Sequence, residues 1–212
     1  MYAGNLELIV ANIPASVTKI GDRAFYGCEN LKKVFLPPNL AIIGEEAFLG
    51  CKSLESVRFP RTITRIGRLA FGGCRSLETA IFEPDGSVAY YEGEPGAERI
   101  ARVAFPNGNV QYYEGERRNE QVTSRLFPDT RLPPSLGEGV FEMCTRLEFV
   151  SLPPSLTTIP SWMFLDCRRL QFINLPMSVR RIGNHAFRNC TSLPSLHFPY
   201  HLTDIGLSLI HI

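Results

Sequence analysis

The chain has 212 residues, a formal net charge of +1 and an isoelectric point of about 7.6. The near-neutral charge argues against nucleic-acid binding, and no stretch approaches the roughly 18 apolar residues of a membrane-spanning helix. Residues 1–14 lack the basic region and long apolar run of a signal peptide. The chain also lacks nucleophile-elbow, phosphate-loop, zinc-protease and calcium-loop motifs, so we expect no enzyme activity, no cofactor, no metal and no small-molecule substrate.

A 23-residue repeat fills the first block, residues 1–82, and returns in the last block, residues 127–212. The same apolar pattern surrounds every cysteine: Phe stands three residues before it, Leu three after it, and further apolar residues six and eight after it, usually followed by Pro. The cysteines that mark this phase are Cys28, Cys51, Cys74, Cys144, Cys167 and Cys190. A period of this length predicts a solenoid whose units stack on one another.

Two short elements are predicted in each unit. The Leu-x-x-Val-x-Leu segment ends in the period-two alternation of a strand, and Pro closes it because Pro cannot donate to a continuing ladder. Residues 44–51 carry apolar residues at the i, i+3, i+4 and i+7 spacing of a short helical turn, with Glu45 and Glu46 in its first turn. A column of glycines (Gly21, Gly44, Gly67, Gly183, Gly206) predicts a tight turn, without requiring positive φ because Pro160 fills the same slot.

Residues 13–40 and 175–199 closely resemble the BspA-type leucine-rich repeats, with the shared pattern Pro-x-x-Val-x-x-Ile-Gly-x-x-Ala-Phe-x-x-Cys-x-x-Leu-x-x-Val-x-Phe/Leu-Pro. The resemblance covers about three quarters of the chain and recurs six times. It implies an α/β leucine-rich-repeat solenoid with a parallel sheet and short helical turns. It also implies a curved, right-handed scaffold that binds proteins, known mainly from bacterial surface proteins and from protists.

The constant phase of the cysteines indicates a ladder of small buried side chains. Disulfides are the alternative, because stacked Cα atoms at roughly 5 Å fall within the disulfide range. Zinc is disfavoured because no Cys-x-x-Cys and no histidine cluster is present. We therefore expect free, buried thiols.

Residues 83–126 interrupt the solenoid with a second repeat of 22 residues. Asp85-Gly86 and Asn107-Gly108 are strong hairpin signals, and they predict two antiparallel β-hairpins in tandem, the first pairing residues 80–82 with the segment from Val88. The Tyr-Tyr-Glu-Gly-Glu core resembles MORN-type repeats, which implies protein or lipid contact. Eight acids against four arginines give residues 83–121 a net charge of −4, which an anionic membrane would repel, so we expect no membrane association.

The last block resumes imperfectly. LPPSL at 132–136 matches LPPSL at 152–156 with an offset of 20 residues, which predicts that the fourth unit is three residues short. Two arrangements stay open: the insert stacks within one solenoid, or it projects and the two blocks meet at an angle. Both ends of the chain stop within a unit, so we expect a fragment of a longer protein with a truncated last block. Localisation, cytoplasmic or cell-surface, stays undetermined.

The positions five and seven residues after each cysteine are expected to lie on the exposed, concave face of the sheet. The face begins basic and aromatic and becomes aromatic in the second block, with Phe149 and Phe172 as an exposed stacked pair and Thr79 and Ile81 between the two parts. The predicted partner-binding residues are Lys33, Phe35, Arg58, Phe149, Phe172, Asn174 and His197. The sequence favours a protein-interaction scaffold; the alternatives are a structural spacer or cell-surface adhesion segment, and a membrane module acting through the MORN-like hairpins.

Overall fold

The computed structural model describes residues 2–82, 88–92, 99–104, 110–112 and 134–207. The backbone divides into two compact units, one of Met1–Phe82 with Arg131–Ile212 and the other of Glu83–Thr130, and each is described by itself.

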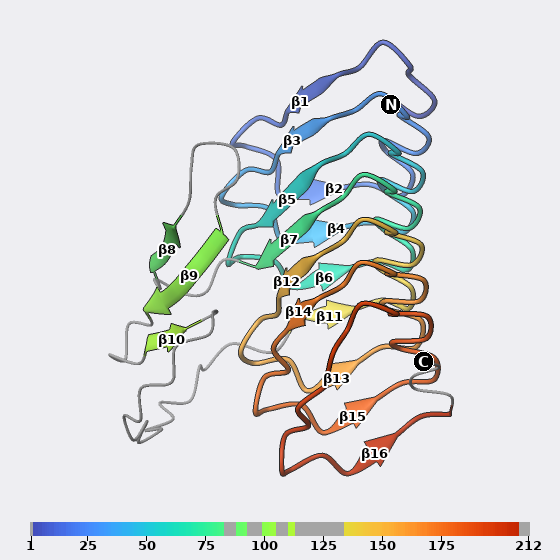
Figure 1. The fold of residues 1–212 in the computed structure, drawn as a ribbon. Coiled ribbons are helices and arrows are strands. Elements are labelled where there is room, and N and C mark those ends of the chain that lie inside the picture. The colour runs from blue at the N-terminus through green and yellow to red at the C-terminus, as the bar shows by residue number, and fades with distance from the viewer. Residues whose placement is uncertain (1, 83–87, 93–98, 105–109, 113–133, 208–212) are drawn as a thin grey trace. The chain divides into compact units, whose positions relative to one another are not determined.

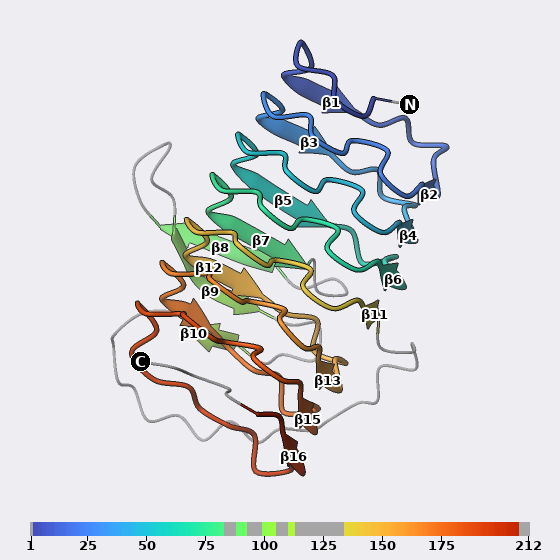
Figure 2. The ribbon, with the colours of Figure 1, turned by 90° about the vertical axis from the view of Figure 1, so that its right-hand side faces the viewer.

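The first unit is a stack of similar turns built around a six-stranded parallel sheet (Figure 1). Its strands lie in the order β1 (Val10–Asn12), β3 (Lys33–Phe35), β5 (Ser56–Phe59), β7 (Thr79–Phe82), β12 (Phe149–Ser151) and β14 (Phe172–Ile173). The middle residue of β3 is buried between two exposed neighbours, which is the alternation that the sequence predicts. Figure 2 shows the strands running side by side along the stack.

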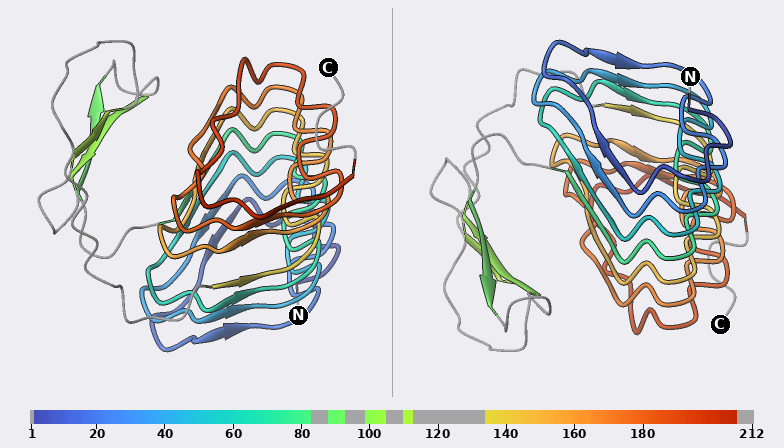
Figure 3. Two further views of the ribbon diagram at one scale, coloured as in Figure 1. Left: turned by 90° about the horizontal axis from the view of Figure 1, so that it is seen from below. Right: turned by 90° about the horizontal axis from the view of Figure 1, so that it is seen from above.

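Shorter strands form the second side of each turn. β2 (Lys19–Ile20), β4 (Ile42–Ile43), β6 (Arg65–Ile66) and β11 (Ser135–Leu136) form one parallel sheet. β13 (Thr158–Ile159), β15 (Arg181–Ile182) and β16 (Asp204–Ile205) form another. Viewed along the stack, the turns of the first unit lie over one another (Figure 3), so residues at one repeat position form a column.

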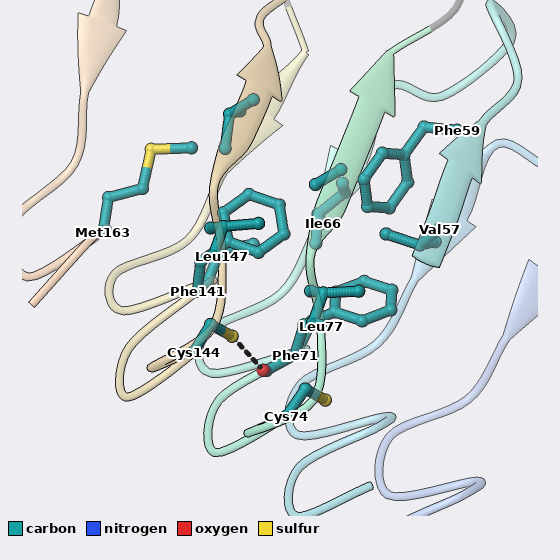
Figure 4. Close-up of a cluster of buried hydrophobic side chains, with 14 of the residues drawn as sticks. Val57, Phe59, Ile66, Phe71, Cys74, Leu77, Phe141, Cys144, Leu147 and Met163 are labelled. Carbon is teal, nitrogen blue, oxygen red and sulfur yellow. Dashed lines mark hydrogen bonds between the residues drawn. The ribbon is translucent and has the colours of Figure 1, made fainter. Parts of the chain in front are cut away.

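Buried phenylalanines form the centre of the core. Tyr2 and the rings of Phe25, Phe48, Phe71, Phe141, Phe164 and Phe187 stack in one column, with centroid separations from 4.9 to 6.1 Å. Phe59 packs edge-on against Phe71 at 5.3 Å. Figure 4 shows Phe59, Phe71 and Phe141 beside the cysteines and leucines of two neighbouring turns. The invariant apolar positions of the repeat are therefore the interior of the stack.

The predicted helical turn is wrong, because the described residues contain no helix. The segment before each cysteine instead has two residues with positive φ, for example Glu46 at 54° and Gly50 at 75°. These left-handed residues turn alternate N–H groups toward the next turn of the stack, where Glu46, Phe48 and Gly50 donate to backbone carbonyls at 2.8–2.9 Å. An α-helix would need those N–H groups for its own carbonyls.

Close backbone approach explains the glycine column within the stack. Gly67 has no positive φ, as expected from Pro160 at the same position of another unit. A Cβ on Gly67 would, however, lie 2.5 Å from the Glu45 nitrogen and 2.6 Å from the Gly44 carbonyl carbon. At Gly67 neighbouring turns thus meet backbone to backbone, which leaves no room for a Cβ at this position.

The two repeat blocks form one continuous stack. β7 pairs directly with β12, with Thr79 opposite Phe149, and β6 pairs with β11, with Ile66 opposite Leu136. Leu136 therefore occupies the isoleucine column, and Gly137 follows it in the glycine column. The LPPSL match aligned Leu136 with Leu156, and this alignment is wrong because Leu136 pairs with Ile66. The predicted length of the fourth unit rests on residues outside the described ranges and stays a prediction.

The second unit has three strands in antiparallel pairing, β8 (Val88–Glu92), β9 (Arg99–Ala104) and β10 (Val110–Tyr112), with β9 in the middle. The first predicted hairpin is wrong, because β7 pairs with β5 and β12 while β8 pairs with β9. The predicted turns at residues 85–86 and 107–108 lie outside the described residues. The MORN-like assignment of this segment, and its boundaries at residues 83–126, stay predictions.

Candidate interaction surface

The cysteine column makes a ladder of hydrogen bonds between turns. Each thiol donates to the backbone carbonyl of the aromatic residue in the neighbouring turn. Cys51 Sγ donates to Phe25 at 3.2 Å, and Cys167 Sγ donates to Phe141 at 3.1 Å. Where the insert intervenes, Cys144 still reaches Phe71 at 3.2 Å (Figure 4). The thiols therefore join neighbouring turns as well as fill space, a role that the sequence did not indicate.

The thiols are free and buried, as predicted. Burial raises the pKa of the Cys51 and Cys190 thiols to about 12, and it raises the pKa of Cys74, Cys144 and Cys167 well above the usual value. The thiolate is the reactive form, so these side chains are chemically inert in the folded protein. Across the described residues no group of histidine, cysteine and acidic side chains could hold a metal ion.

The outer face of the six-stranded sheet carries most of the predicted binding residues. Lys33 and Phe35 lie on β3, Arg58 on β5, Phe149 on β12 and Phe172 on β14. Phe35 is 57% exposed and Phe172 is 47% exposed, which is unusual for rings on a regular sheet. Asn174 and His197 are also exposed, although Asn174 follows the end of β14 and His197 lies in no strand.

The register divides this face into two patches. In the first patch, Lys33 lies opposite Val10 on β1, and Phe35 lies opposite Asn12. In the second patch, Phe149 and Phe172 are Cα partners on β12 and β14. The predicted exposure of Phe149 is wrong, because its side chain is half-buried, while its neighbour Phe172 is exposed.

The middle of the face differs from the prediction. Ile81 on β7 points outward by its strand position, but it is only 8% exposed, and Thr79 on the same strand is half-buried. A continuous exposed stripe from β1 to β14 is therefore absent from the described sheet. Alternation along a strand predicts which face a residue occupies and does not predict what covers that face.

Ion pairs border the second patch. Arg146 contacts Glu78 at 2.6 Å, and Arg169 contacts Glu148 at 3.6 Å, each joining neighbouring turns. These four side chains are between 42 and 53% exposed, so the pairs contribute little to stability but neutralise the charge beside the sheet. The first patch has a different character, since the described structure contains no ion pair at Lys32 or Lys33 next to the exposed Phe35.

Sequence reasoning missed the apolar contribution of the first strand. Val10 on β1 is 42% exposed, and the preceding Ile9 is 55% exposed. Val10 belongs to the same outward column as Lys33, so the column rule that found the other residues could have found it. It extends the first patch to the edge of the sheet.

A parallel-stranded stack in which each 23-residue turn adds a buried leucine and one strand to the main sheet defines a leucine-rich-repeat protein. The BspA-type leucine-rich-repeat region matches residues 1–130 and 118–211 in six copies. The chain belongs to this family, which confirms the resemblance of the repeats. A comparison with curated proteins finds no match.

Two crystal structures of bacterial proteins have a similar fold. A leucine-rich repeat protein of T. pallidum is 24% identical with a TM-score of 0.66, and the match covers 96% of this chain and 75% of that one. A leucine-rich repeat protein of Eubacterium ventriosum is 22% identical with a TM-score of 0.64, covering 93% of this chain and 41% of that one. At these identities the likeness concerns the fold. No helix in the described parts of the chain has the length and hydrophobicity to cross a membrane.

Proposed function

We propose that this chain is a non-catalytic scaffold that binds a protein partner through the outer face of its six-stranded sheet. The observation that carries the proposal is the exposure of Phe35 and Phe172 on a regular sheet whose inner face packs against the core. Large rings held on rigid strands lose little entropy on binding and supply much of the energy at protein interfaces.

The two patches suit different parts of a partner. Phe35 with Val10 and Lys33 offers an apolar contact beside a positive charge, while Phe172 lies beside neutralised charge and the exposed amide of Asn174. A protein surface with apolar residues and an acidic group fits the first patch by charge. The family is one of repeat scaffolds, which agrees with a binding role and names no partner.

The experiment is a selection from a displayed protein library, followed by affinity measurement against variants. Phe35→Ala and Phe172→Ala remove one ring from each patch, and Lys33→Glu reverses the charge. Truncating a central ring is expected to weaken binding by about 2 kcal/mol, or roughly thirtyfold. Tyr200→Ala is the matched control, since Tyr200 is 77% exposed and lies outside the sheet. Selected partners that bind the variant carrying Phe35→Ala, Phe172→Ala and Lys33→Glu together as tightly as the wild type would overturn the proposal.

A further inference from the structure

One column of the stack is left-handed in every described turn, whatever residue occupies it. The residue five places before each cysteine has a φ between 52° and 61°, and the occupants are Arg23, Glu46, Leu69, Gly139, Trp162 and His185. Gly139 is the one member of this left-handed column without a side chain. Because larger residues adopt the same φ in the other turns, Gly139 is not required for its conformation, and its missing side chain needs another explanation.

Two neighbouring side chains fill the place above Gly139. A Cβ on Gly139 would lie 2.8 Å from Leu69 Cδ2 and 2.8 Å from Glu142 Oε2. Leu69 comes from the preceding turn of the stack and Glu142 from the same turn, and Gly139 is buried beneath them. The missing side chain thus lets the Glu142 carboxylate fold down beside a leucine instead of extending into water.

The Glu142 carboxylate is half-buried beside this leucine. Among the described residues, no hydrogen bond or ion pair involves its oxygens, whereas the nearby Asp166 pairs with Arg168 at 3.1 Å. Burial raises the pKa of the Glu142 carboxyl, the charge of Arg68 lowers it from beyond ion-pair distance, and Asp166 raises it. An unpaired charge that is partly withdrawn from water costs free energy in the free protein, which makes this carboxylate a candidate for binding a cation.

Apolar side chains border the carboxylate. Trp162 follows Gly139 in the left-handed column and is half-buried, and the Gly139 N–H donates to the Ser161 carbonyl of that next turn at 3.0 Å. At a spacing of roughly 4.8 Å between turns, the indole lies within reach of the carboxylate. Met143, which follows Glu142, is 41% exposed. Since the left-handed column holds charged residues in other turns, packing does not dictate an apolar side chain here.

We propose that Leu69, Glu142 and Trp162 form a binding site for an arginine side chain of a protein partner. The guanidinium group stacks its flat face on the indole and donates hydrogen bonds to the carboxylate, and its methylene stem covers the leucine. Arginine supplies the counter-charge that Glu142 lacks, and lysine would supply the charge without the flat face. The site lies on the segments before the cysteines and not on the six-stranded sheet, so this inference does not depend on the proposed function.

The test is an NMR titration of the full chain with N-acetyl-arginine amide. Trp162 is the only tryptophan in the sequence, so its indole N–H gives a single signal that reports on this site. The arginine probe is expected to shift this signal in a saturable way. N-acetyl-citrulline amide has nearly the same shape without the charge and should bind about tenfold more weakly or worse. N-acetyl-lysine amide carries the same charge without the flat group and should also bind more weakly than the arginine probe.

Two substitutions that change the net charge equally give the decisive comparison. Glu142→Gln keeps the shape of the side chain and should raise the dissociation constant of the arginine probe about tenfold or more. Glu138→Gln removes the charge of an exposed acid four residues earlier and should leave it unchanged. Urea unfolding should show no loss of stability in Glu142→Gln, because an unpaired charge is removed. The proposal is overturned by the absence of a saturable shift, by equal binding of the citrulline probe, or by equal weakening in the two variants.

Discussion

Replacing Gly67 by alanine tests the claim that backbone contact sets the spacing of the turns. The new Cβ would lie 2.5 Å from the Glu45 nitrogen, 2.6 Å from the Gly44 carbonyl carbon and 2.7 Å from the Glu45 Cα, where ordinary contacts begin at 3.4 Å. The turns must separate by about 0.8 Å, against the 2.8 Å hydrogen bond from the Gly67 N–H to the Ile43 carbonyl. Overpacking of this kind costs about 3 kcal/mol when backbone atoms, and not flexible side chains, must move.

Equilibrium unfolding in urea measures this cost, at a protein concentration where the chain is monomeric. Gly21→Ala is the matched control: it has the same residue, the same column and the same substitution, but its Cβ meets nothing within 4 Å. Its free energy of unfolding is expected to stay within about 1 kcal/mol of the wild type, or to rise slightly because alanine restricts the unfolded chain. Equal losses in both variants would refute the reasoning, because a general helix- or turn-propensity effect would not distinguish the two positions.

Four further predictions concern the thiols, the insert and the second patch. Burial raises the pKa of Cys51 to about 12, so between about pH 9 and pH 12 the folded protein keeps a proton that the unfolded chain loses. The free energy of unfolding is therefore expected to fall as pH rises through this range, and the stabilisation from Cys51 is fully present below about pH 9. At pH 8, iodoacetamide should label the thiols only as fast as the protein unfolds, and rapid native labelling would contradict their burial. Replacing residues 83–134 by the five-residue connection 60–64 restores the 23-residue spacing from Cys74 to the next cysteine. Circular dichroism and urea unfolding of this variant should show that the stack is retained. Loss of cooperative unfolding would show that the direct pairing of β7 with β12 depends on the insert. Phe172→Ser should change the free energy of unfolding by less than about 1 kcal/mol, since the ring is half exposed, and a larger loss would assign the ring to packing and not to binding.

The sequence predicts the columns of the fold because the columns repeat. Phe, Cys and Leu recur at one spacing and are buried throughout the described stack, apart from the partly buried Leu193 of the last unit. The helical turn predicted for the segment before each cysteine was wrong, because a spiral with two left-handed residues also produces the i, i+3, i+4, i+7 spacing. One signal was present: Gly27, Gly50 and Gly73 precede their cysteines, and Asp166 and Asn189 take that place in later units, all residue types that tolerate positive φ.

The sequence also predicts which side of the sheet a residue faces better than it predicts how exposed that residue is. Strand alternation placed Lys33, Phe35 and Phe172 correctly on the outward side of the sheet. It failed for Ile81, which is buried, because exposure depends on what lies over a residue and not on the residue's own strand. The placement of Leu136 failed for a related reason: the repeated letters LPPSL aligned it with Leu156, whereas the pairing of β11 with β6 places it opposite Ile66.

Repetition also explains why the fold is easier to infer than the partner. The inward column beside the outward one reads Val34, Val57, Ala80, Val150 and Ile173, and packing between turns restricts it to small or branched apolar residues. The outward column reads Lys33, Ser56, Thr79, Phe149 and Phe172, and no repeat constrains it. A side chain that packing does not dictate can vary from turn to turn without harm to the stack. The exposed rings at such outward positions, Phe172 in this column and Phe35 two residues after Lys33, are therefore where selection for a partner would act.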